Sequence, residues 1–237
     1  MMNVKLGVLL VAIVMASPAG AQTWAVTTAI ELSANSEPAK GAVLRPQMEE
    51  LMGLLQGKRW DEAERLATQL RKAYEASFNQ QLPHYSFRTS AEYEAFKKTA
   101  SAPFEWVDWS YKQCLQMQAF IRAEKQQFAE AVALLQDVVK LAPYSADARA
   151  EMAAALNSLG RFEEALVLYK ETYRLAEQYS SQQELRGMAL RGMGFSLTEL
   201  KRLDEAERAY RQDLEIEPTN KLALGELAYI ERLRKGR

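Results

Sequence analysis

Phe128-Ala129-Glu130-Ala131 and Phe162-Glu163-Glu164-Ala165 share one pattern, in which an aromatic residue is followed by two mostly acidic residues and then Ala. The pattern occurs twice more, at Trp60–Ala63 and, with Leu in place of the aromatic residue, at Leu203–Ala206. The Ala residues of the four copies are separated by 68, 34 and 41 positions. The first interval is twice the second, and the third interval is seven residues longer than the second. The chain therefore contains an internal repeat.

The overall composition favours helices and gives no electrostatic case for nucleic acid. Only 11 Gly and 7 Pro are present among 237 residues, and Ala, Leu, Glu, Gln and Arg, which lose little side-chain freedom in a helix, are frequent. The 30 basic and 31 acidic side chains nearly cancel. Because nucleic-acid binding normally requires an excess of basic residues, we expect no nucleic-acid partner.

The period and the positions of small residues resemble the tetratricopeptide-repeat family, whose repeats are pairs of antiparallel helices. Small residues are needed where two helix backbones approach closely, and Pro ends a helix because it lacks the N–H donor. The tryptophan that the family carries near the repeat start is replaced here by Leu115, Arg149 and Leu190. The residues that match the family are the small residues Ala119, Ala153, Gly194, Ala131, Ala165 and Ala206, the turn residue Gly160, the large packing residues Tyr169 and Tyr210, and the prolines Pro143 and Pro218.

The resemblance implies an all-α fold, with antiparallel helix-pair repeats stacked in a right-handed α-solenoid. The last helix should cover the final apolar face, with its basic residues at the helix C-terminus. The predicted divisions are a signal peptide (1–21), a flexible leader (22–42), a divergent helix pair (43–75), an aromatic-rich non-consensus helical segment (76–108), three repeats (109–218) and a capping helix (219–237).

The N-terminal residues have the pattern of a secretory signal peptide. Lys5 precedes an apolar run of 11 residues, Leu6 to Ala16, and Ala19-Gly20-Ala21 offers the small residues that a signal peptidase needs. A bilayer span takes about 20 apolar residues, so an uncleaved anchor is the less favoured alternative. We therefore predict export with cleavage near Ala21, a periplasmic or secreted mature protein, and no transmembrane span after cleavage.

Two stretches depart from the repeat. In the segment 76–108, Thr89 and Glu92 have capping-box spacing and predict a short helix through Lys98, and Pro103 suits the first turn of a long helix carrying Trp106 and Trp109. Seven extra residues around 179–186 are expected to lengthen helices, as in the longer repeats of kinesin light chains. Large aromatics most often pack in a core, but the alternative for this segment is a second binding patch formed by Tyr85, Phe87, Trp106 and Trp109.

The sequence contains no pattern that carries chemistry. His84 is the only histidine, Cys114 is the only cysteine, and neither lies in a cluster of metal-ligating or nucleophilic residues. There is no Gly-rich phosphate loop. We therefore expect a protein without catalytic activity or cofactor, and Cys114 is expected to be a buried apolar residue.

The remaining feature is surface. In the family, ligands lie in the concave groove lined by the first helix of each repeat, which implies a protein or peptide partner, and we expect an adaptor in an envelope complex. The alternatives are an inhibitor or immunity protein that occludes a secreted enzyme, or a self-associating scaffold; the oligomeric state is left open. The groove positions carried over from the family are Gln113, Gln116, Phe120, Asp147, Asn157, Met188, Arg191, Phe195, Thr198 and Tyr229.

Overall fold

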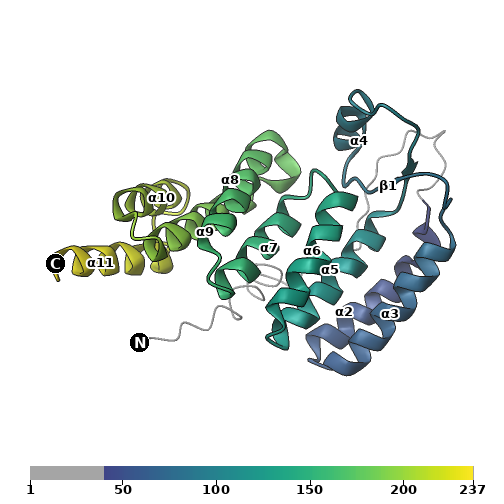
Figure 1. The fold of residues 1–237 in the computed structure, drawn as a ribbon, viewed down its shortest axis with the longest axis horizontal. Helices are drawn as coiled ribbons and strands as arrows, with labels where there is room; N and C mark the ends of the chain where they lie inside the picture. The colour runs from purple at the N-terminus through teal and green to yellow at the C-terminus, as the bar shows by residue number, and fades with distance from the viewer. Residues whose placement is uncertain (1–39, 237) are drawn as a thin grey trace. The chain divides into compact units, whose positions relative to one another are not determined.

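The structure, a computed structural model, describes residues 40–236. The predicted signal peptide, residues 1–21, and all but the last three residues of the predicted leader, 22–42, lie outside this part. The secondary structure of the described chain is mainly α-helix (Figure 1), so the predicted all-α helix-pair fold is confirmed. Within residues 40–236, no helix combines the length and the apolar character that crossing a bilayer requires.

The helices form two compact units, divided between Ser145 and Ala146. The N-terminal unit contains two helix pairs, α2–α3 and α5–α6, joined by a segment with one short helix and two short parallel strands (Figure 1). Its elements are η1 (Ala42–Leu44), α2 (Arg45–Gln56), α3 (Trp60–Ala76), β1 (His84–Tyr85), α4 (Ser90–Lys97), β2 (Glu105–Trp106), α5 (Trp109–Glu124) and α6 (Phe128–Leu141).

The C-terminal unit continues the alternation of paired helices. Each helix packs against its successor, and the apolar residues of α11 join a core with α9 and α10. Ala223 and Ile230 of α11 are buried in this core, as expected for a capping helix. The elements are α7 (Ala146–Ser158), α8 (Phe162–Gln178), η2 (Ser180–Gln182), α9 (Leu185–Glu199), α10 (Leu203–Ile216) and α11 (Lys221–Lys235).

The repeated sequence pattern marks the second helix of each pair. The helices α3, α6, α8 and α10 begin at the aromatic or Leu residue of the four copies, and the Ala of each copy is fully buried. Two residues before each of these helices, the chain takes a left-handed conformation, which Gly160 adopts without strain. In the other three turns the left-handed residue is not Gly, with φ of 55° at Lys58, 61° at Gln126 and 62° at Lys201.

The close approach of helices within a pair is visible at α9. A Cβ atom on Gly194 would lie 2.6 Å from the ring of Tyr210 on α10, so the position predicted from the family for close helix contact has that role. Gly192, on the same helix, meets Tyr169 of α8 in the same way, at 2.3 Å. Since Tyr169 and Tyr210 are both buried, the two rings fix the distance of α9 from the helices on either side.

Two expectations for the non-repeating stretches need correction. The long helix α5 does not start near Pro103, because Glu105 and Trp106 form β2 and Asp108 caps the helix by accepting a hydrogen bond from the Ser110 backbone N–H at 3.0 Å. The extra residues around 179–186 lengthen helices only in part: α8 has 17 residues against 14 in α6 and α10, and the rest form η2.

The other expectation for the segment 76–108 agrees with the structure. The α4 helix begins after Thr89, whose hydroxyl accepts from the Glu92 backbone N–H at 3.2 Å. The Glu92 carboxylate in turn accepts from the backbone N–H of Arg88 at 2.7 Å, one residue earlier than in the standard capping box.

Candidate functional site

On α5, the predicted groove residues are involved mainly in packing. Phe120 is 8% exposed and its ring packs edge-on against Trp60, with centroids 5.9 Å apart. Gln116 accepts a hydrogen bond from the fully buried Lys112. Gln113 is partly exposed, but its side-chain oxygen is buried. Phe120 therefore contributes mainly to the contact between α3 and α5.

In the C-terminal unit, three of the predicted residues are bound within the fold, two of them to another helix. Asn157 of α7 accepts a hydrogen bond from the Ser196 hydroxyl of α9 at 3.0 Å. Thr198 is 2% exposed and donates to the Gly194 carbonyl of its own helix at 2.9 Å. Arg191 binds Asp213 of α10, with Nη1 and Oδ1 2.7 Å apart. These groups already have partners inside the fold.

The pair between Arg191 and Asp213 is electrostatically unusual. The Asp213 side chain is completely buried, and this burial raises the pKa of its carboxyl, while the guanidinium of Arg191 acts in the opposite direction. An unpaired buried charge is costly, so Arg191 is needed by the fold and is poorly available to a partner.

The remaining groove positions differ in accessibility. Met188 is 6% exposed, and Asp147 is partly exposed. Phe195 is also partly exposed and lies edge-on to Phe162 of α8, with centroids 6.3 Å apart. Tyr229 of α11 is 38% exposed, with the Arg232 guanidinium 5.8 Å from its ring centre. Of the three aromatic side chains in the predicted set, Phe195 and Tyr229 retain more accessible surface than Phe120.

Sequence reasoning did not single out the other exposed apolar residues of this helix as a surface. Leu222 and Leu224 of α11 are 38% and 48% exposed, while Ala223 and Ile230 face the core. The signal was present in the sequence, because the apolar residues of α11 span more of the helix circumference than a single buried stripe requires. Tyr229 follows Leu222 by seven residues and so lies on the same side of α11, whereas Leu224 lies on the opposite side of the helix.

The aromatic segment forms a small core of its own. Phe87 is fully buried, and its ring lies within 6.5 Å, centre to centre, of Tyr85 and Trp106. Trp106 stacks on Tyr93 at 4.4 Å with an angle of 15° between the planes. Three residues of the predicted patch, Tyr85, Phe87 and Trp106, therefore pack against one another. Trp109 lies on α5, where its ring contacts the ammonium of Lys112 at 4.4 Å.

The groups that could carry chemistry are dispersed. The His84 ring nitrogen lies 3.5 Å from a carboxylate oxygen of Glu105 and 3.0 Å from the carbonyl of Asn79. Among residues 40–236, no three His, Cys, Asp or Glu side chains gather in a way that could hold a metal ion. Burial raises the pKa of the Cys114 thiol to about 12.

Comparison with known proteins agrees with the architecture. A family model described as "Tetratricopeptide repeat" matches residues 144–216, the stretch that contains the pairs α7–α8 and α9–α10. These residues are tetratricopeptide repeats. No curated protein has a sequence significantly similar to this chain.

Solved structures of tetratricopeptide proteins share the fold at low sequence identity. The TPR-like repeats of a Podospora anserina protein described as a kinesin light chain are 18% identical, with a TM-score of 0.59, over 85% of this chain and 91% of that one. A tetratricopeptide repeat protein from Parabacteroides merdae is 14% identical over 81% of this chain and 60% of that one, with a TM-score of 0.56. The second TPR domain of human RPAP3, solved with an HSP70 peptide, is 22% identical over 49% of this chain and 92% of that one. Its TM-score is 0.45, which indicates only a distant structural similarity.

Proposed function

We propose that this protein is a non-catalytic scaffold that binds a protein or peptide partner. The observation that carries the proposal is the run of tetratricopeptide repeats over residues 144–216, because stacked helical repeats expose extended surfaces used for binding. A fold by itself hosts many functions, so the assignment also needs a surface. The accessible side chains of the C-terminal unit supply one.

The binding surface proposed consists of the accessible apolar side chains Tyr229 and Leu222 on α11 and Phe195 on α9. Aromatic side chains contribute a large share of the binding energy in protein interfaces. Exposed apolar residues that gather in one place commonly mark interaction sites. Arg191 and Thr198 are left out of the contact set, since both are bound within the fold.

The location proposed is outside the cytoplasm, in an envelope complex of a bacterium. Its support is the N-terminal sequence alone, with Lys5, the apolar run of Leu6 to Ala16 and the small residues Ala19 to Ala21. N-terminal sequencing of the expressed protein from cell fractions tests this part. Export predicts a periplasmic or secreted chain that starts at Gln22, and an intact N-terminus in the cytoplasm would refute it.

The binding proposal can be tested by crosslinking the mature protein in an envelope extract and identifying what it captures. The variant Tyr229→Ala should lower the affinity for the captured partner by at least about tenfold, as for a central aromatic residue of an interface. Phe195→Ala provides a second variant on α9. The matched control is Val167→Ala on α8, which removes a side chain that is 65% exposed but lies outside the proposed surface. If the partner binds both variants as tightly as the control, the surface is wrong.

A further inference from the structure

Within residues 40–236, the helix α11 has a neighbour on one side only. Its buried side chains, Ala223 and Ile230, lie in the core that it shares with α9 and α10. On the other side Leu224 is 48% exposed, Ala228 is exposed, and a Cβ atom on Gly225 would meet nothing within 4 Å. The helices α8, α9 and α10 each pack against the preceding and the following helix, whereas α11 keeps a free face.

The free face of α11 carries a short pattern in which two apolar residues lie between two charged ones. Its members are Lys221, Leu224, Ala228 and Glu231, and all four are exposed. The intervals of three, four and three residues place these side chains on one side of the helix. The same intervals separate the positions through which two helices of a coiled coil pack together. The pattern therefore suits contact with a second helix.

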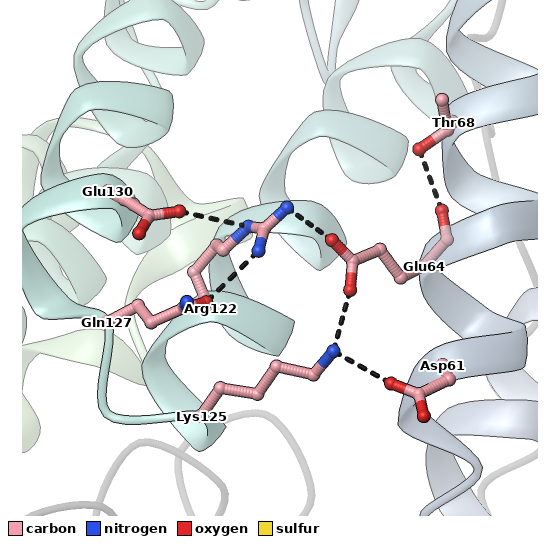
Figure 2. A network of polar contacts seen from close by, with 7 residues as sticks. All are labelled: Asp61, Glu64, Thr68, Arg122, Lys125, Gln127 and Glu130. Carbon is pink, nitrogen blue, oxygen red and sulfur yellow. Dashed lines mark hydrogen bonds and ion pairs between the residues drawn. The ribbon is translucent and has the colours of Figure 1, made fainter.

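The charged members of this pattern have no partner in the described part of the chain. Elsewhere, charges at a contact between helices are paired across it: Figure 2 shows Arg122 and Lys125 of α5 bound to Glu64 of α3, with the Lys125 Nζ 2.7 Å from the carboxylate. The side chains of Lys221 and Glu231 make no hydrogen bond or ion pair with any residue of 40–236. Both are available to a helix that packs on the free face.

The free face is complementary to itself when two copies of α11 lie antiparallel. If Leu224 of one copy lies opposite Ala228 of the other, then Lys221, three residues earlier, lies opposite Glu231, three residues later on the second helix. A two-fold axis repeats each contact, so two Leu–Ala contacts lie between two Lys–Glu pairs. In a parallel pair in register, Lys221 would meet Lys221 and Glu231 would meet Glu231, and like charges at a contact are unfavourable.

This order of charges selects the occupant of the face. A complementary helix must present a basic residue, two apolar residues and an acidic residue at the same intervals, and must run in the opposite direction. The helix α11 itself has that order. We propose that α11 pairs antiparallel with α11 of a second copy of this chain, with Leu224 against Ala228 and Lys221 bound to Glu231 of the other copy.

The proposed pair is small and reversible. From Lys221 to Glu231 the helix rises by about 15 Å. Contacts that bury less than about 1,200 Å² are typical of weak association, so we expect a Kd on the order of 0.1 mM. Leu224 lies on the opposite side of α11 from Leu222 and Tyr229. The pairing therefore does not rest on the partner surface proposed above, and the two can be tested separately.

The test is sedimentation equilibrium of the mature chain at concentrations from about 20 µM to about 1 mM, which bracket the expected Kd. The average mass should rise from that of a monomer towards that of a dimer. Leu224→Ala should raise the Kd by at least about fivefold, because each copy loses apolar contact area. The matched control Val167→Ala, at an exposed position of α8, should leave the Kd unchanged. A monomer at every concentration, or equal Kd values for Leu224→Ala and the control, overturns the proposal.

Charge reversal tests the antiparallel register. Lys221→Glu and Glu231→Lys should each raise the Kd by at least about fivefold, because each places like charges opposite one another at both ends of the pair. An equal mixture of the two variants should regain the original affinity, since at one end the two introduced charges attract and at the other the two native ones do. Lys170→Glu, the same change at an exposed position of α8, should have no effect. If the mixture associates no more tightly than either variant alone, the pairing is wrong.

Discussion

The glycine at the contact of α9 with α10 gives the sharpest test of the packing. In Gly194→Ala, the new Cβ atom would lie 2.6–2.8 Å from three ring carbons of Tyr210, where ordinary contacts begin near 3.4 Å. The ring is fully buried and cannot swing away into solvent. Overpacking of a core lowers the free energy of unfolding by about 1–3 kcal/mol. The greater helix preference of Ala over Gly raises it by about 1 kcal/mol. With so little room for the ring to move, we expect a net loss of about 2 kcal/mol in the free energy of unfolding.

The matched control is Gly225→Ala on α11, where a Cβ atom would meet nothing within 4 Å. This substitution should stabilise the protein by up to about 1 kcal/mol, because only the helix preference acts. In the double variant Gly194→Ala/Tyr210→Leu the loss should be smaller than the sum of the single losses, since the ring that causes the clash is gone.

Urea unfolding followed by far-UV circular dichroism is the suitable assay. The tryptophans are Trp24, Trp60, Trp106 and Trp109, so tryptophan fluorescence does not report on the C-terminal unit. The reasoning is refuted if Gly194→Ala and Gly225→Ala shift the unfolding midpoint in the same direction. Additive effects in the double variant would show that Tyr210 is not the obstacle.

Three further predictions concern buried and partly buried polar groups. Asp108→Ala should cost about 3 kcal/mol, because it removes the α5 cap and leaves Arg45 without the buried carboxylate that it binds; tryptophan fluorescence during urea unfolding measures the loss. Cys114 should react with Ellman's reagent at pH 8 only after unfolding, since its thiol is buried and its pKa is raised to about 12; rapid reaction of the native protein would contradict this. Burial and, secondly, the charge of Glu199 raise the pKa of Glu226, so this carboxyl ionises less readily in the folded state than in the unfolded one and destabilises the fold as pH rises. Glu226→Gln should therefore stabilise the protein at pH 7, with a gain that disappears below the ordinary glutamate pKa of about 4.3; a gain that persists at pH 3 would contradict this origin.

The positions of the second helices could be predicted because their cause is local. Each begins at the aromatic or Leu residue of the repeated pattern, where acidic residues favour the helix N-terminus. Three of the four are preceded by an Arg that binds the Glu three residues later, as Arg161 binds Glu164 at 2.7 Å. The left-handed turn residue could be predicted only at Gly160, because Lys58, Gln126 and Lys201 reveal nothing of their conformation in sequence.

The roles of individual groove residues could not be predicted in the same way, because they depend on which neighbour a side chain meets. Family spacing placed Arg191 and Thr198 on a ligand surface, yet Arg191 binds the buried Asp213 of α10, 22 residues away. Thr198 is 2% exposed. The Asp213 side chain is completely buried, and a buried carboxylate requires a cation from a neighbouring helix. The identity of the residue at 213 thus determines the role of Arg191.

The start of α5 shows how a local signal is overridden by distant contacts. Pro103 is suited to a first helical turn, but the chain after it is held in β2, where the Glu105 N–H donates to the carbonyl of Pro83 at 2.9 Å. Asp108 then combines two functions, since its carboxylate caps α5 and binds Arg45 of α2, 63 residues earlier. The cap and the ion pair at Asp108 favour a helix start there over one at Pro103. The ion pair with Arg45 cannot be predicted from the residues near the start of α5, because Arg45 is distant in the sequence.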